Sequence, residues 1–156
     1  MKDRTSYVEF IEQTYFGSVA DGNIYQVLSC FNDDARVIIR HGDQPERLFA
    51  LHPLEGEAEL PSFYEHLCAN YDCWFGKYHH YIDIEQDSAA SRFTVRLEPK
   101  TDGLYANTPP QELRNCNFFE FRANRISDMI IYYSNPDEQL DDAHANNDKP
   151  TGYPKP

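Results

Sequence analysis

Two tyrosines and one asparagine are the side chains in this sequence best placed to stabilise charge on a bound molecule. Tyr15 and Tyr64 carry hydroxyl groups that can donate to a developing oxyanion in a dry pocket. Asn117 alternates with Phe119 along an apolar strand pattern, so its amide is expected to be buried and to need a partner. The alternative is that the tyrosines are core residues whose hydroxyls bond to backbone carbonyls.

Histidines are the candidates for a general base, because the imidazole pKa lies near neutral pH. His80 shares the predicted inward face of its strand with Ile82 and Ile84, whereas His79 faces outward. His41 follows Val37 and Ile39 on the inward face of an earlier strand. The alternative is that both histidines lie at a rim or on the surface.

Three helices are expected to hold these groups, and all three precede most of the strands. A stripe of Val8, Ile11, Tyr15 and Val19 predicts the first helix, with Ser6 and Glu9 as its capping box. Asn23 is suited to cap a second, shorter helix. The third is expected over residues 57–71 and carries Phe63, Tyr64 and Leu67 inward, starting late because of Pro61.

Strand patterns occupy most of the remaining sequence. Alternation predicts strands over 35–41, 78–85, 91–98, 113–122 and 126–134, with a short strand at 48–51. Helices followed by a run of antiparallel strands indicate an α+β fold. We expect one domain over residues 1–135 and an acidic, Pro- and Asn-rich tail over 136–156.

Three segments, in order, resemble the nuclear transport factor 2-like superfamily, which includes ketosteroid isomerase and the SnoaL-like polyketide cyclases. They are YFGSVADGNIYQVLSCFNDDARV, LEGEAELPSFYEHL and NCNFFEFRANRISDMIIYYS. The resemblance covers about residues 6–135. It implies a cone-shaped fold in which a curved antiparallel sheet wraps around three N-terminal helices and leaves a cavity between them.

The resemblance to ketosteroid isomerase also implies residue roles. Tyr15 falls at the oxyanion-hole tyrosine, Tyr64 at a second tyrosine that hydrogen-bonds the first, and Asn117 at a protonated aspartic acid that donates a hydrogen bond. The catalytic base of that family falls at Ile39, which cannot accept a proton. His80, with or without His41, is the expected replacement, since pocket histidines perform acid–base chemistry in the scytalone dehydratases of this fold.

The predicted site therefore consists of catalytic Tyr15, His80 and Asn117 in an apolar pocket. The residues expected to line it are Val37, Ile39, His41, Phe63, Tyr64, Leu67, Trp74, Phe119, Met129, Ile131 and Tyr133. Asp128 is a weaker candidate, because it should turn outward unless a β-bulge reverses it.

The expected function is that of a SnoaL-like cyclase, isomerase or dehydratase, without metal or cofactor, acting on an apolar oxygenated ring compound. Two alternatives remain: a non-catalytic binding module of the same fold, and a β-subunit-like role beside a larger oxygenase.

Composition and charge bear on partners and location. The net charge of −12 argues against binding nucleic acid or anionic membranes. No apolar stretch approaches the ~20 residues needed to span a bilayer, and the N-terminus lacks a signal-peptide core, so a cytoplasmic location is expected. The four cysteines form no CxxC pair and are expected to be reduced. Phe118, Ile130 and Tyr132 should form an exposed apolar patch, which predicts a homodimer unless the tail covers it.

Overall fold

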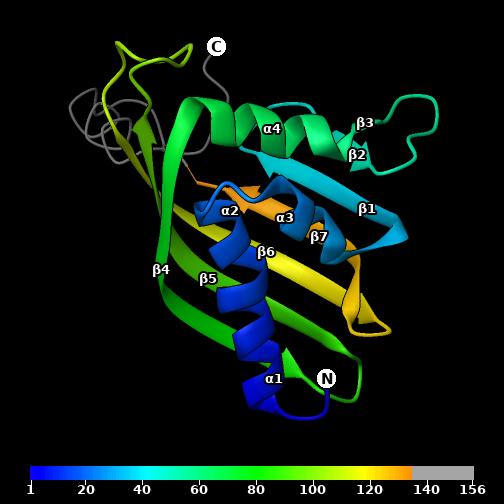
Figure 1. The fold of residues 1–156 in the computed structure, drawn as a ribbon. Helices are drawn as coiled ribbons and strands as arrows, with labels where there is room; N and C mark the ends of the chain where they lie inside the picture. The colour runs from blue at the N-terminus through cyan, green and yellow to red at the C-terminus, as the bar shows by residue number, and fades with distance from the viewer. Residues whose placement is uncertain (135–156) are drawn as a thin grey trace.

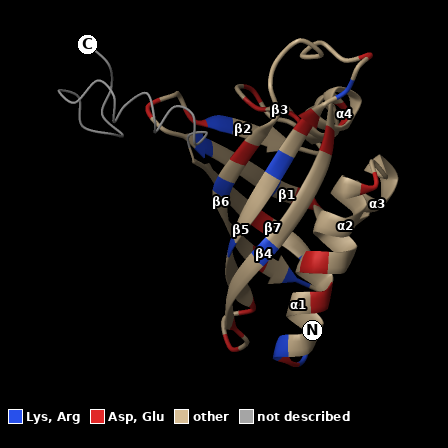
Figure 2. Ribbon diagram, turned by 90° about the vertical axis from the view of Figure 1, so that its left-hand side faces the viewer, with Lys and Arg blue, Asp and Glu red and all other residues tan. Residues whose placement is uncertain are grey.

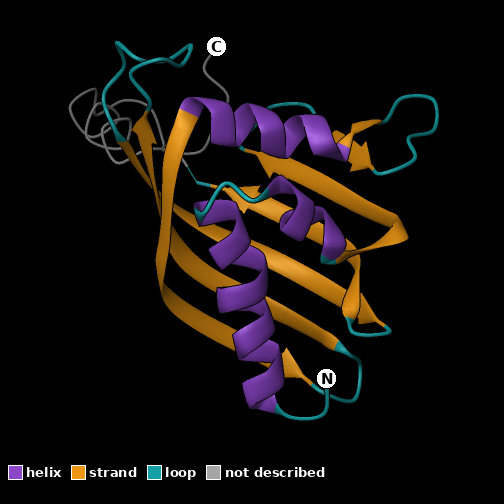
Figure 3. Ribbon diagram, in the orientation of Figure 1, coloured by secondary structure: helices purple, strands orange, loops and turns teal. Residues whose placement is uncertain are grey.

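The computed structural model describes residues 1–134, in which helices pack on the concave face of a single curved sheet (Figure 1). The helical segments are α1 (Arg4–Glu9), η1 (Phe10–Phe16), α2 (Gly17–Ala20), α3 (Ile24–Ser29) and α4 (Leu60–Asn70). The first three run on as one long helix across the sheet, and α4 lies over the opposite end (Figure 3). The predicted tail, 136–156, lies outside the described residues.

Seven strands make the sheet, in the order β3-β2-β1-β7-β6-β5-β4. Their bounds are β1 (Phe31–His41), β2 (Arg47–Ala50), β3 (Ala58–Glu59), β4 (Tyr71–Asp83), β5 (Ser88–Pro99), β6 (Gln111–Arg122) and β7 (Arg125–Tyr133). The predicted α+β cone fold is confirmed. The sheet is mixed rather than purely antiparallel, because β1 pairs with β7, and β2 with β3, in parallel.

The long N-terminal helix differs from its prediction in two details. Its cap is Asp3, whose carboxylate accepts hydrogen bonds from the backbone N–H and the hydroxyl of Ser6. Its middle, η1, is a seven-residue π-helical segment. The wider π turn adds residues to each turn, so Tyr15 and Phe16 both face the sheet and are 2% and 3% exposed.

The strand faces follow the predicted alternation in β1 and β7. Val37 and Ile39 are buried under the helices, and Met129 and Ile131 lie beside them in the parallel register of β1 and β7. Asp128 is exposed on the opposite, convex face, as predicted. The pKa of Asp128 is raised, mainly by partial burial and to a smaller extent by the negative charge of the neighbouring Glu120 carboxylate.

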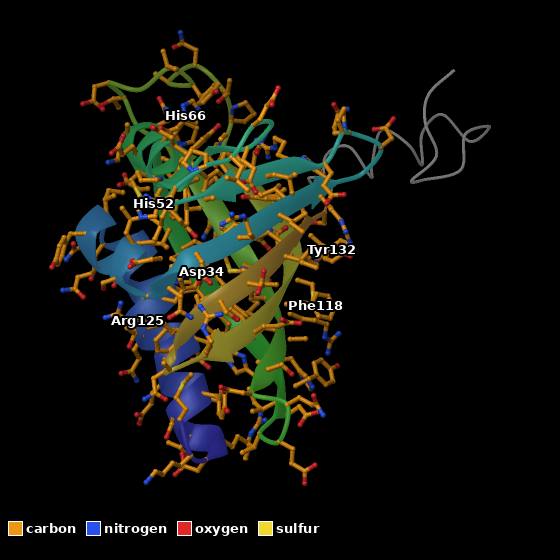
Figure 4. The ribbon with its side chains drawn as sticks, turned by 90° about the vertical axis from the view of Figure 1, so that its right-hand side faces the viewer. Asp34, His52, His66, Phe118, Arg125 and Tyr132 are labelled. Carbon is orange, nitrogen blue, oxygen red and sulfur yellow. The ribbon has the colours of Figure 1, made fainter. Side chains whose placement is uncertain are left out.

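The convex face carries the predicted apolar patch. Phe118 and Tyr132 are 47% and 38% exposed, their rings meet edge to face at 5.7 Å, and Ile130 beside them is half-buried. Figure 4 shows Phe118 and Tyr132 pointing away from the helices. Acidic and basic residues are interspersed along the ribbon seen in Figure 2. Within the described residues, no helix combines the length and the apolarity that crossing a membrane requires.

All four cysteines lie among the described residues and are free thiols, as expected. Burial raises the pKa of Cys30 to about 11 and that of Cys73 to about 12, so these thiols stay protonated at neutral pH. They pack as small apolar side chains.

Candidate functional site

An apolar cavity lies between the helices and the sheet. Its walls come from η1, α2, α4 and strands β4 to β7: Tyr15, Phe16, Val19, Phe63, Tyr64, Leu67, Phe75, Phe93, Val95, Leu97, Asn115, Asn117, Ile131 and Tyr133. The enclosed part of the cavity has a volume of about 40 Å³, so it is a narrow slot with room for a few waters.

Tyr15 and Tyr64 meet within this cavity. Their hydroxyl oxygens are 2.7 Å apart, and the two residues are 2% and 1% exposed. One comes from η1 and the other from α4, so the pair also joins the two helical layers. Burial raises the pKa of both phenols, which keeps them neutral and able to donate. The hydrogen bond that the resemblance implied is therefore present.

Asn117 is 1% exposed and contributes a second polar group to the cavity wall. Its Nδ2 lies 3.7 Å from the sulfur of Met129, a weak acceptor. Its Oδ1 is buried and has no hydrogen-bond partner among the described residues. The neighbouring Asn115 is different, because its Oδ1 accepts from the backbone N–H of Ser134 at 3.2 Å.

His80 faces inward and is 9% exposed, but it does not reach the cavity wall. Its Nδ1 lies 2.7 Å from the hydroxyl oxygen of Ser91, and its Nε2 lies 2.6 Å from a carboxylate oxygen of Glu12. Its ring stacks on Tyr78 at 5.3 Å. The histidine thus ties η1 to β4 and β5, with Ser91 placed directly opposite Asn117 in the register of β5 and β6.

His41 stands one ring away from the cavity. Its imidazole lies 5.5 Å from the ring of Tyr133, which lines the wall. Burial raises the pKa of the Tyr133 phenol to about 12. The positive charge of Arg47 lowers this pKa, but its effect is smaller. Tyr133, like Tyr15 and Tyr64, is therefore a neutral donor at physiological pH.

Apart from His41 and Trp74, the predicted lining residues divide into two groups. Phe63, Tyr64, Leu67, Ile131 and Tyr133 lie at the cavity, together with Tyr15 and Asn117. Val37, Ile39, Phe119 and Met129 are buried in the adjoining core rather than at the wall.

Trp74 was wrongly expected to line the pocket. It is 47% exposed on the outer side of β4, because a bulge between Gly76 and His79 shifts the alternation of that strand. Inward positions therefore fall at Cys73 and Phe75 before the bulge, and at His80 after it. The Trp74 ring lies across the backbone of Gly76, where a Cβ atom would stand 2.5 Å from it. Ile84, also expected inward, follows the end of β4 and is 48% exposed.

Several wall residues were missed by the sequence analysis. Phe16 faces the cavity only because of the π-helical turn, and Phe75 only because of the bulge in β4. Phe93, Val95 and Leu97 alternate with polar residues on β5, so a clear sequence signal for them was present.

The wall is rich in hydrogen-bonding groups but contains no carboxylate, imidazole, ammonium or guanidinium among the described residues. Its polar groups are the phenols of Tyr15, Tyr64 and Tyr133 and the amides of Asn115 and Asn117. Such a site can bind and polarise an oxygen atom on a ligand.

Comparisons with known proteins find this architecture in solved structures. No protein-family model and no curated protein matches the sequence. A protein of unknown function with a cystatin-like fold, from Methylobium petroleophilum PM1, is 18% identical, with a TM-score of 0.63 over 99% of this chain and 97% of its own.

Two further matches are named for enzymes. The epoxide hydrolase/cyclase-like enzyme SalBIII, described for a role in pyran ring formation in polyether salinomycin, is 14% identical, with a TM-score of 0.65 over 85% of this chain and 94% of its own. An LEH-like epoxide hydrolase of M. tuberculosis is 13% identical, with a TM-score of 0.58 over 83% of each chain. At these identities the likeness shows a shared fold, which is the fold that the sequence resemblance implied.

Proposed function

We propose that this protein is a cofactor-independent, SnoaL-like enzyme that cyclises, isomerises or dehydrates an apolar, oxygenated ring compound. The observation that carries the proposal is the buried Tyr15–Tyr64 pair, 2.7 Å apart in an apolar cavity. Neutral donors fixed in a water-poor site stabilise developing negative charge without reorganising, which is a main source of catalytic power. SalBIII, which shares the fold, is described as epoxide hydrolase/cyclase-like, and this supports cyclisation among the proposed reactions.

In this proposal Tyr15 donates its hydroxyl hydrogen to a substrate oxygen, and Tyr64 holds Tyr15 in place. The phenyl and aliphatic walls bind the ring by burying its apolar surface. The enclosed part of the slot, about 40 Å³, is smaller than the cavity of about 150 Å³ that holds a benzene molecule, so even a single-ring substrate needs the wall rings to move or must lie partly in the open mouth. Slender substrates need the least movement.

His80 is the candidate base behind the wall, and a water molecule in the slot would have to carry the substrate proton toward it, because neither Ser91 nor His80 lines the cavity. Ser91 lies beside Asn117 in the sheet and contacts His80 at 2.7 Å, while Glu12 holds the other ring nitrogen at 2.6 Å. His41, behind Tyr133, is the second candidate.

A non-catalytic binding module is the second candidate function. It is favoured by the absence of an ionisable base from the described cavity wall and by Ile39, a buried apolar residue at the position where the resembling family has its base.

Substitution of Tyr15 by Phe separates the two functions. If the protein is an enzyme, Tyr15→Phe should lower kcat on the order of 10²–10³-fold while KM changes little, since the lost donor acts mainly in the transition state. If it is a binding module, Tyr15→Phe should weaken ligand affinity modestly, and no compound that binds should be converted. Steady-state assays on compounds first found by binding decide between these outcomes.

A further inference from the structure

The orientation of the Asn117 amide decides which kind of ligand atom can sit against it. Its Nδ2 is turned toward Met129, which belongs to the core and not to the cavity wall. One Nδ2 hydrogen is used in this contact, and Oδ1 is the buried atom of the amide that has no partner among the described residues. The reverse orientation would set Oδ1 against the electron-rich sulfur and give up the weak N–H···S contact.

A buried amide oxygen without a partner is costly, about 1–3 kcal/mol relative to a satisfied one. Asn117 Oδ1 is the one described side-chain atom in this condition, and Asn117 itself lines the cavity. The neighbouring Asn115 shows how the fold satisfies such an atom when it serves structure alone, because its Oδ1 is bonded by Ser134.

The tyrosine pair supplies a hydrogen-bond donor that complements the Asn117 acceptor. Two hydroxyls that share one hydrogen bond use only one of their two hydrogens in it. Among the described residues the two hydroxyls bond only to each other, so the second hydrogen of the Tyr15–Tyr64 pair can be donated within the same cavity. The slot therefore offers a donor from the tyrosine pair and an acceptor from Asn117.

We propose that Asn117 acts as a hydrogen-bond acceptor that selects ligands carrying a hydroxyl group on an apolar ring, rather than as a donor to an oxyanion. A ligand hydroxyl can accept from the tyrosine pair and donate to Asn117 Oδ1. A ligand oxygen without a hydrogen, as in a ketone or an ether, leaves Oδ1 buried and unsatisfied and is disfavoured. This inference rests on the proposed ligand site and names its substrate class as hydroxylated ring compounds, including the enol form of a ketone.

The test uses three slender probes that differ at one atom group: 4-ethylphenol, 4-ethylanisole and ethylbenzene. Their affinities are measured by NMR titration of the isotope-labelled full-length protein and of Asn117→Leu. In the wild type, 4-ethylphenol should bind more tightly than 4-ethylanisole. In Asn117→Leu the ratio of the two affinities should shift toward the anisole on the order of tenfold. Ethylbenzene has no oxygen atom, so its binding to Asn117→Leu shows whether the apolar cavity of the variant is intact.

Thr94→Val is the control, because it removes a buried polar group from β5 at a residue that does not line the cavity. It should keep the wild-type preference for the phenol.

The proposal would be overturned if the ratio of the affinities for 4-ethylphenol and 4-ethylanisole were the same in the wild type and in Asn117→Leu. It would also be overturned if none of the three probes bound the wild type. If Asn117→Leu does not fold, equal or tighter binding of 4-ethylanisole by the wild type overturns it instead. None of these measurements needs turnover. A phenol preference without conversion of any compound would therefore reject the enzymatic function and leave the role of Asn117 standing.

Discussion

At the scale of single residues, the cavity depends on neutral hydrogen-bonding groups that burial keeps neutral. Tyr15, Tyr64 and Tyr133 all have pKa values raised by removal from water, and no charged side chain among the described residues shares their wall. The site is therefore suited to hold an oxygenated molecule by directional hydrogen bonds in an apolar setting.

Removing the Tyr15 hydroxyl should cost stability as well as function. In Tyr15→Phe the buried Tyr64 hydroxyl loses the only partner it has among the described residues, which should lower the free energy of unfolding by about 1–3 kcal/mol. Chemical denaturation measures this loss. The double variant with Tyr64→Phe should recover part of it, because no unpaired hydroxyl then remains. A double variant that is destabilised by the full sum of the single variants would contradict the coupling.

The buried phenols also predict how stability changes at high pH. Burial raises the pKa values of Tyr7 and Tyr133 to about 12, and in Tyr7 the hydrogen bond to Asp87 adds to this rise. A tyrosine in the unfolded chain has a pKa of about 10. The folded protein thus keeps protons that the unfolded chain releases. This stabilisation is complete below about pH 10 and is lost as the pH rises through about 12. Denaturation curves in this range should show a steady fall, with phenolate absorbance appearing late; an unchanged midpoint would contradict the assignment.

At the scale of elements, His80 works as a cross-link between helix and sheet. It joins Glu12 on η1 to Ser91 on β5 through two short contacts, and Tyr78 covers one face of its ring. These contacts give His80 a structural role whether or not it takes part in catalysis.

A double-mutant cycle on His80→Ala and Ser91→Ala should reveal this link. Each single variant leaves a buried polar partner unpaired and should lose about 1–3 kcal/mol of stability. The coupling between them should be about 0.5–3 kcal/mol. His79→Ala is the control, since the exposed neighbour should change stability by no more than about 0.5 kcal/mol. Additive losses in the cycle would show that the contact carries no free energy.

Elements also show what could and could not be predicted from the sequence. The order of helices and strands, the faces of β1 and β7 and the Tyr15–Tyr64 contact were predictable from alternation and from the resemblance. The residues of the cavity wall were harder to predict. A π turn in η1 and a bulge in β4 each change which side chains of their element face inward. The π turn leaves no mark in residue type, so Phe16 was missed. The bulge begins at Gly76, and an isolated glycine within a strand pattern is a bulge signal that the sequence analysis did not use, so Trp74 was placed inward.

At the scale of the whole molecule, the convex face of the sheet is the candidate contact for a second copy of the chain. Phe118, Ile130 and Tyr132 form its apolar patch, and Arg40 stacks on the Tyr132 ring at 5.5 Å. Patches of this kind on a sheet commonly mark an interface.

If this face forms a homodimer, a charge at its centre should separate the subunits. The wild-type protein should sediment as a dimer and Phe118→Lys as a monomer, with unchanged secondary structure by circular dichroism. Leu104→Lys is the control, because Leu104 is 79% exposed but lies in the loop between β5 and β6. A wild-type protein that remains monomeric at every concentration would rule this interface out.

The central claim is that the slot around Tyr15 and Asn117 binds a small oxygenated ring compound. The most direct test is a thermal-shift screen of hydroxylated aromatics, ring ketones and terpenoids against the wild type and the double variant Tyr15→Phe/Asn117→Leu. A ligand at about 100 times its dissociation constant adds about 2.7 kcal/mol of stability, which raises the melting temperature visibly. We expect such a rise in the wild type and its loss in the double variant. An equal rise in both proteins, or none with any compound, would contradict the claim.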